Sequence, residues 1–177
     1  MRITTRGRYA LRASLAMAKL EKNKEPVSIH YLSEQENISS VFLEQIFFKL
    51  RKAGLVTSIR GPGGGFCFAM PLDKLTVKQI LDASGEDLNI TFCDKRLENC
   101  ERAGECMCHH VWIELNDLVN EYFSNITLAS ILEKYGDKPF PLDGADSRII
   151  DAVPSASARA GAESRPAALA AGPDLKR

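Results

Sequence analysis

The fold is decided by residues 40–70, which read SVFLEQIFFKLRKAGLVTSIRGPGGGFCFAM. The first part of this stretch has apolar residues at the i, i+3, i+4, i+7 spacing of an amphipathic helix, namely Leu43, Ile46, Phe47 and Leu50. Gly54 stands where a helix C-cap glycine is expected, so the spacing predicts a helix over residues 40–53. Two β-prone runs, 55–59 and 66–70, then flank the glycine-rich turn RGPGGG and predict a hairpin.

Two further helices are expected on the N-terminal side. Apolar residues at helical spacing predict a helix over residues 5–20, and Ser28 is a suitable N-cap for a short helix that ends near residue 36. Three small helices followed by a hairpin is the plan of a winged helix-turn-helix. We therefore expect a mainly α fold with a small β wing, in which residues 1–75 form a DNA-binding domain.

The C-terminal side carries a helix over Val77–Ser84, a cysteine-rich loop over 93–108, a long helix over 109–124 and a last helical turn over 128–135. The long helix has a wide apolar face and little chain left to cover it, which favours a homodimer over packing on its own N-terminal domain. Residues 76–135 are expected to be the domain of the metal-binding loop and dimerisation helix. Residues 136–177 are rich in Ala and Pro and poor in aromatics, which predicts a disordered tail.

Charge divides the chain into two parts, although the formal net charge of its 177 residues is zero. Residues 1–70 contain 11 Lys and Arg and 5 Asp and Glu, a net charge of +6. Residues 71–177 contain 12 Lys and Arg and 18 Asp and Glu, a net charge of −6. A basic front suits a polyanion such as double-stranded DNA. No apolar run approaches the roughly 20 residues that span a bilayer, and the N-terminal apolar stretch carries arginines at helical spacing. These features predict a cytoplasmic protein without a membrane partner or a cleaved signal.

The helix over 40–53 is the expected recognition helix. Its N-terminal end, which faces base edges in helix-turn-helix docking, presents Ser39, Ser40, Val41, Glu44 and Gln45. Gln can pair with adenine, Glu can accept from cytosine and Ser can serve either. Lys49, Arg51 and Lys52 lie further along and are expected to meet phosphates.

The turn RGPGGG has a different expected role on the same DNA. Arg60 beside Gly61 places a cation on a backbone that lacks side chains, which suits the narrow minor groove. The turn is not a nucleotide-binding P-loop, because no Gly-Lys-Ser/Thr follows it.

Four of the five cysteines cluster as Cys93-x6-Cys100-x5-Cys106-x-Cys108, followed by His109 and His110. Thiolates and imidazoles in a polar stretch favour a metal site, and this chemistry alone does not separate zinc from an iron–sulfur cluster. Cys67 lies between two Phe residues in the wing and is expected to pack as a small apolar side chain.

Together these stretches resemble the IscR/NsrR group of bacterial winged-helix transcription regulators. The resemblance rests on MRITTRGRYALRA, ISSVFLEQIFFKLRKAGLV, SIRGPGGGF and the cysteine loop that ends in CMCHHVW. It implies a homodimer on a palindromic operator, with DNA binding controlled by an iron–sulfur cluster. The IscR-like branch holds a 2Fe–2S cluster, here through Cys93, Cys100, Cys106 and His109. In the NsrR-like branch, an Asp of the first helix reaches a 4Fe–4S cluster. The matching position in this chain is Arg8, so the resemblance favours the IscR-like branch and its 2Fe–2S cluster.

Three departures from the family pattern leave details open. The first cysteine gap is six residues where five is commoner, and Cys108 or His110 is an alternative fourth ligand to His109. Val41 occupies a position where IscR-like proteins often carry Ser, so the operator is expected to differ.

The alternatives to a cluster-sensing repressor or activator are a zinc-bound or thiol-redox repressor of the same fold and a cluster-carrying electron-transfer protein. No pattern of catalytic residues predicts an enzyme.

Overall fold

The computed structural model describes residues 3–21, 25–91, 93 and 105–138. The fold is that of the unit Met1–Leu142. The predicted disordered tail lies outside the described residues beyond position 138. Cys100 also lies outside them.

The helix-turn-helix is built as the sequence predicts. It consists of α2 (Ile29–Glu36) and α3 (Ser40–Lys52), and α1 (Thr5–Leu20) precedes it as the third helix of the winged helix-turn-helix plan. Asn37 turns the chain between α2 and α3 in a left-handed conformation (φ 50°), which Asn tolerates better than most residues. The hydroxyl of Ser33 donates to the carbonyl of Ile38 at 2.6 Å and closes this turn.

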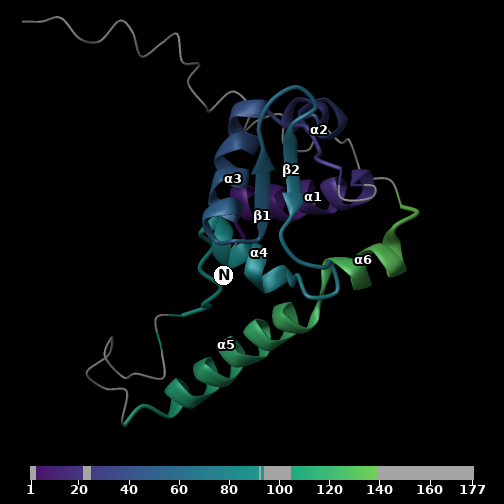
Figure 1. Cartoon of the computed structure of the whole chain (residues 1–177). Helices are drawn as coiled ribbons and strands as arrows, with labels where there is room; N and C mark the ends of the chain where they lie inside the picture. The colour runs from purple at the N-terminus through teal and green to yellow at the C-terminus, as the bar shows by residue number, and fades with distance from the viewer. Residues whose placement is uncertain (1–2, 22–24, 92, 94–104, 139–177) are drawn as a thin grey trace, which may run out of the picture. The chain divides into compact units, whose positions relative to one another are not determined.

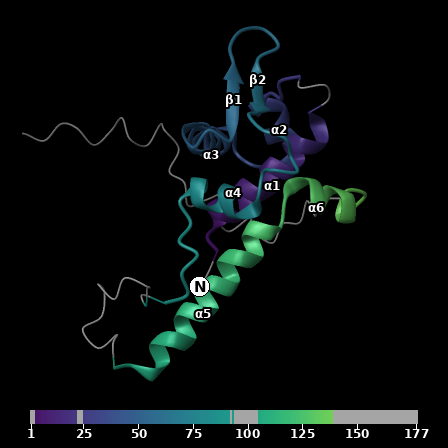
Figure 2. The ribbon, with the colours of Figure 1, turned by 60° about the horizontal axis from the view of Figure 1, so that its bottom comes forward.

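The wing is an antiparallel hairpin of β1 (Val56–Ile59) and β2 (Gly65–Phe68), with Val56 opposite Phe68. Val27 pairs with Phe66 on the other side of β2 through two backbone hydrogen bonds of 2.8 and 2.9 Å. A Cβ on Gly65 would come within 2.3 Å of the Val27 carbonyl oxygen, so this close backbone approach requires glycine. Figure 2 shows the hairpin beside α3, with its turn pointing away from the helices.

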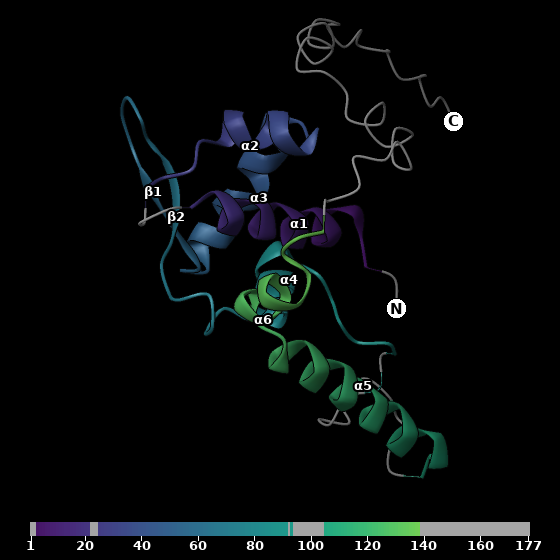
Figure 3. The ribbon, with the colours of Figure 1, turned by 90° about the vertical axis from the view of Figure 1, so that its right-hand side faces the viewer.

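The remaining helices are α4 (Val77–Ser84), α5 (Met107–Asn125) and α6 (Leu128–Tyr135). Helix α1 packs between α2 and α3 on one side and α4 and α6 on the other (Figure 3). After α5 the chain returns to the start of α4 and is held there by two backbone hydrogen bonds. The N–H of Val77 donates to the carbonyl of Ile126 and the N–H of Leu128 donates to the carbonyl of Leu75, each at 2.9 Å. The ribbon of α5 extends away from α1–α3, and its C-terminal part lies beside α4 (Figure 1).

The main core lies around α1 and α3. Its fully buried side chains include Met17, Leu43, Phe47, Leu50 and Ile80. The residues on either side of the predicted boundary at residue 75 pack against each other, because α4 contacts both α1 and α3. The division into residues 1–75 and 76–135 therefore stays a prediction about roles.

Candidate nucleic-acid interface and metal centre

The N-terminal end of α3 presents polar side chains to solvent. Ser39, Ser40, Glu44 and Gln45 are all exposed, as their predicted base-contacting role requires. Ser39 is the N-cap of α3 but makes no side-chain cap hydrogen bond. Val41 is 58% exposed beside them and offers a methyl surface instead of a hydroxyl.

Arg51, near the C-terminal end of α3, is held by two neighbours. Its guanidinium lies 5.5 Å from the centre of the Phe48 ring and donates to the hydroxyl of Ser58 on β1 at 3.0 Å. These contacts join the recognition helix to the wing. They keep a cation at the exposed junction of the two elements, where a phosphate contact is predicted.

Lys49 has a different environment from the one that its predicted phosphate contact assumes. It is half-buried, and its Nζ donates to the backbone carbonyl of Ser84, the last residue of α4, at 2.9 Å. A cation at a helix C-terminus is favoured by the helix dipole. Lys49 therefore ties α3 to α4, and a phosphate contact by Lys49 would require this bond to open.

The tip of the wing leaves its cation exposed. Arg60 and Gly61 directly follow β1, and both are exposed. Gly61 and Gly63 have φ values of 104° and 72°, a region that favours glycine. The glycines thus make the tight turn that leaves Arg60 exposed at the start of the wing tip.

Three of the four clustered cysteines are described. Cys106 is the N-cap of α5 and half-buried, Cys108 is exposed in the first turn, and Cys93 is half-buried. The first turn of α5 contains no acidic residue, so the positive end of its dipole is open to an anionic group such as a thiolate. Within the described ranges, no three His, Cys, Asp or Glu side chains lie close enough to hold a metal ion.

His109 and His110 differ sharply in environment. His109 is 4% exposed, and its Nδ1 is buried with no hydrogen-bond partner among the described residues, whereas His110 is exposed. A buried ring nitrogen without a partner is costly unless another group satisfies it. A metal is one group that does so, and this burial is what favours His109 over His110 as a ligand.

The fifth cysteine fits its predicted packing role. Cys67 lies on β2 and is 7% exposed. Burial raises the pKa of the Cys67 thiol, and the negative charge of Glu21 raises it further. The thiolate that a metal requires is therefore disfavoured at this position.

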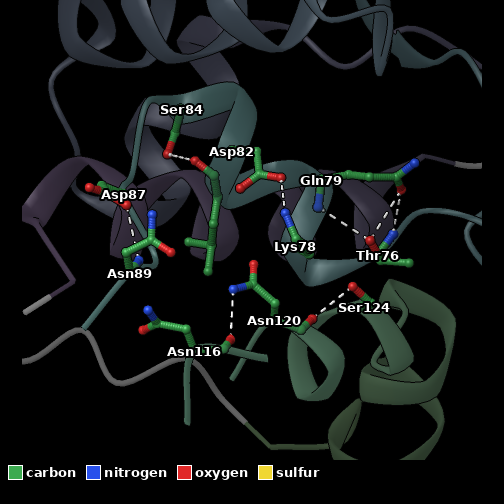
Figure 4. Close-up of polar contacts among 11 residues, drawn as sticks. Thr76, Lys78, Gln79, Asp82, Ser84, Asp87, Asn89, Asn116, Asn120 and Ser124 are labelled. Atoms are coloured by element: carbon green, nitrogen blue, oxygen red, sulfur yellow. Dashed lines mark hydrogen bonds and ion pairs between the residues drawn. The ribbon is translucent and has the colours of Figure 1, made fainter. Parts of the chain in front are cut away.

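The sequence interpretation missed two polar contacts near α4. The carboxylate of Glu86 accepts from the backbone N–H of Thr4 at 2.9 Å, from that of Gly7 at 3.1 Å and from the Thr4 hydroxyl. It thus caps the N-terminus of α1, whose own first turn has no acidic residue. That missing acid was the available signal, since helix N-termini favour a negative charge. In the second region, Asn116 of α5 binds the backbone of Ile90 and Cys93, and Figure 4 shows Asn116 bonded to Asn120 along the helix.

Helix α3 beside a hairpin, with exposed polar and basic side chains on both, defines the chain as a winged helix-turn-helix DNA-binding protein. No helix within the described ranges is long and apolar enough to cross a membrane.

Comparison with known proteins narrows this class. The model of the Rrf2 family, described as an iron-dependent transcriptional regulator, matches residues 3–134. The HTH-type transcriptional regulator IscR of Pectobacterium carotovorum is 36% identical over 159 residues, which cover 90% of this chain and 93% of the relative. A Neisseria meningitidis protein with the provisional name of HTH-type transcriptional regulator is 42% identical over 134 residues, covering 76% of this chain and 89% of that protein.

Solved structures agree with the family match. T. potens IscR superposes with a TM-score of 0.61 at 27% identity, covering 79% of this chain and 93% of that one. CymR, the global cysteine regulator of B. subtilis, gives a TM-score of 0.61 at 29% identity, and the match covers 76% of this chain and 98% of CymR. The chain belongs to the Rrf2 family. It is a helix-turn-helix transcriptional regulator of the Rrf2/IscR type and, like its named relatives, not an enzyme.

Proposed function

We propose that this regulator binds a palindromic operator as a homodimer, and that an iron–sulfur cluster held by Cys93, Cys100, Cys106 and His109 controls this binding. The observation that carries the proposal is His109, a histidine 4% exposed whose Nδ1 has no partner among the described residues. The iron-dependent description of the family and the similarity to IscR proteins support the same cofactor. We favour a 2Fe–2S cluster, because the Asp of 4Fe–4S relatives is replaced by Arg8.

The residues present suit such a group by their chemistry, although Cys93, Cys106 and His109 do not lie close enough together in the described chain to hold a metal ion. Three thiols and one buried imidazole are a ligand set that iron–sulfur clusters accept, and Cys106 stands at the positive end of a helix dipole. When bound, an iron–sulfur cluster supplies a redox-active centre that can also be lost when iron is scarce. The exposed Cys108 and His110 are the alternative fourth ligands.

The homodimer is supported by the exposed face of α5. Of the ten large apolar side chains that are exposed in the described chain, five lie on this helix: Met107, Val111, Trp112, Leu118 and Tyr122. An apolar face of this kind marks an interaction surface. A second copy of the same helix covers it symmetrically, as a two-fold dimer requires, and places two recognition helices on one DNA duplex.

The segment after α4 couples the proposed cluster site to the DNA-binding helices. Ser84, at the end of α4, accepts the bond from Lys49 of the recognition helix, and Glu86 caps α1 two residues later. The same segment then leads to Cys93. Fixing or releasing Cys93 therefore acts on a stretch of chain that is bonded to both α1 and α3. Such a stretch can bias the position of α3 between two states of the dimer.

The ligand set is tested on protein purified without oxygen, by iron, sulfide and zinc analysis and by visible absorption. The wild-type chain is expected to be brown, with bands between roughly 400 and 600 nm that report iron–sulfur charge transfer. The variants Cys100→Ala and His109→Ala are expected to lose or alter these bands, whereas His110→Ala, its matched control, keeps them. A colourless protein with stoichiometric zinc would contradict the cluster and support the zinc-bound repressor.

A further inference from the structure

Helix α5 buries two of its described residues, and both are polar. His109 is 4% exposed and Asn116 is 7% exposed. They are seven residues apart, which is about two helical turns, so they lie on the same face of the helix. The exposed apolar residues Val111 and Leu118 lie roughly 180° around the helix from them at about 100° per residue. The face that carries the buried His109 therefore also carries a buried amide.

The side chain of Asn116 binds the backbone of the segment that leads into the cysteine loop. Its Oδ1 accepts from the N–H of Ile90 at 2.8 Å, and its Nδ2 donates to the carbonyl of Cys93 at 3.2 Å. Both ends of one amide are thus used on two backbone groups that are three residues apart. A partly buried N–H and a partly buried carbonyl would both lose their partner without this side chain.

Asn120, one turn further along α5, provides a contrast. Its Nδ2 donates to the backbone carbonyl of Asn116 at 2.7 Å, and its own carbonyl accepts from the hydroxyl of Ser124 at 2.7 Å (Figure 4). These bonds remain within α5. The bonds to the incoming segment are made by Asn116. The two asparagines therefore differ in that one bonds to the cysteine loop and the other bonds only within the helix among the described contacts.

We propose that Asn116 is a positioning residue that clamps Cys93 to α5. Cys106 and His109 belong to α5 itself, so the clamp fixes the backbone of a third proposed ligand against the helix that carries them. The three side chains do not yet lie close enough together in the described chain to hold a metal ion, so the clamp sets where Cys93 starts from and not the finished site. This inference rests on the proposed function, in which those three residues are ligands. Residues that orient ligands from outside the coordination sphere commonly change metal affinity by about 10- to 100-fold.

The experiment compares Asn116→Ala with its matched control Asn120→Ala. In the metal-free chain, hydrogen exchange at the Ile90 amide is expected to be at least about tenfold faster in Asn116→Ala and unchanged in Asn120→Ala. In the loaded chain, a chelator is expected to remove the visible absorbance at least about tenfold faster from Asn116→Ala than from Asn120→Ala or the wild type.

A second variant covers the case in which Asn116→Ala does not fold. Asn116→Asp keeps an oxygen that can accept from Ile90 but loses the donor to the Cys93 carbonyl. It is expected to retain slow exchange at Ile90 while losing the absorbance faster than Asn120→Ala. Loss of absorbance at the wild-type rate in the Asn116 variants, despite fast exchange at Ile90 in Asn116→Ala, would overturn the clamp and leave the proposed function standing.

Failure of the clamp and failure of the proposed ligand set can be told apart by what the wild-type chain contains. Visible bands in the wild type together with unaltered Asn116 variants count against the clamp alone. A wild-type chain that contains neither iron–sulfur nor zinc counts against the ligand set, and the clamp fails with it. If zinc is present instead, the same variants are compared by chelator competition, and the same tenfold loss is expected.

Discussion

Helix α3 buries four of its 13 residues, all apolar, whereas the longer α5 buries two of its 19, both polar. The four apolar residues pack into a core shared with α1 and α4. Of the two polar residues of α5, Asn116 instead binds the segment that leads to a proposed metal ligand, and five large apolar side chains of this helix remain exposed. The comparison teaches that the helix-turn-helix is stabilised within one chain, whereas α5 leaves exposed the surface on which we propose that a second copy binds.

The largest effect is expected on stability, when a buried ion pair between α1 and α2 is removed. Arg12 of α1 forms an ion pair with Glu36 of α2 at 2.7 Å and also donates to the Glu36 backbone carbonyl at 2.9 Å. Glu36 is 6% exposed, so Arg12→Ala would leave a buried carboxylate without its partner. We expect a loss of about 3 kcal/mol in the free energy of unfolding, measured by denaturant titration.

The matched control is an exposed pair on α4. Lys78 and Asp82 are four residues apart and partly or fully open to solvent, so Lys78→Ala is expected to cost less than about 0.5 kcal/mol. Equal losses in the two variants would show that burial of Glu36 does not set the strength of the Arg12 pair.

A second prediction concerns the exposed face of α5. Leu118 is 62% exposed, and Leu118→Glu places a charge in the centre of the proposed dimer interface. The dissociation constant of the dimer is expected to rise at least about tenfold, or roughly 1.4 kcal/mol, in analytical ultracentrifugation. The charge would be fully hydrated in the monomer, so the thermal unfolding of α1–α3 should not change. A variant that dimerises like the wild type would rule out this face as the interface.

The smallest expected effect is on the wing. Arg60 is exposed at the tip and is proposed to meet the DNA backbone or minor groove. For Arg60→Ala we expect weaker operator binding and a slope of log affinity against log salt that is reduced by about 1, measured by fluorescence anisotropy. Lys19→Ala, on α1, is the control and should leave the slope unchanged.

The sequence predicts the elements of this chain closely because their signals are local. Apolar spacing in α3 and the glycines of the wing each act within a few residues. The boundaries of α3 and the wing strands lie within two positions of the predicted ones, and those of α4 coincide with them. The long helix begins at Met107, two residues earlier than predicted, and Cys106 occupies its N-cap position without a side-chain cap hydrogen bond.

The contacts that connect the elements could not be predicted in the same way. Lys49 with Ser84, Glu86 with Thr4 and Asn116 with Cys93 join residues that lie 35, 82 and 23 positions apart. Neither periodicity nor a motif marks such a pair in one sequence. Asn116 left a weak signal, as a polar residue two turns from His109 on the same face. The burial of His109, which separates it from His110, became visible only in the folded chain.

The central claim is that the state of the cysteine region controls DNA binding, and one measurement tests it most directly. Operator fragments are selected from genomic DNA, and their affinity is measured for cluster-loaded and metal-free protein at the same salt concentration. We predict an affinity ratio of at least about fivefold on at least one operator, within the usual range of coupling between two sites. Equal affinities of the two forms for every selected fragment would contradict the account.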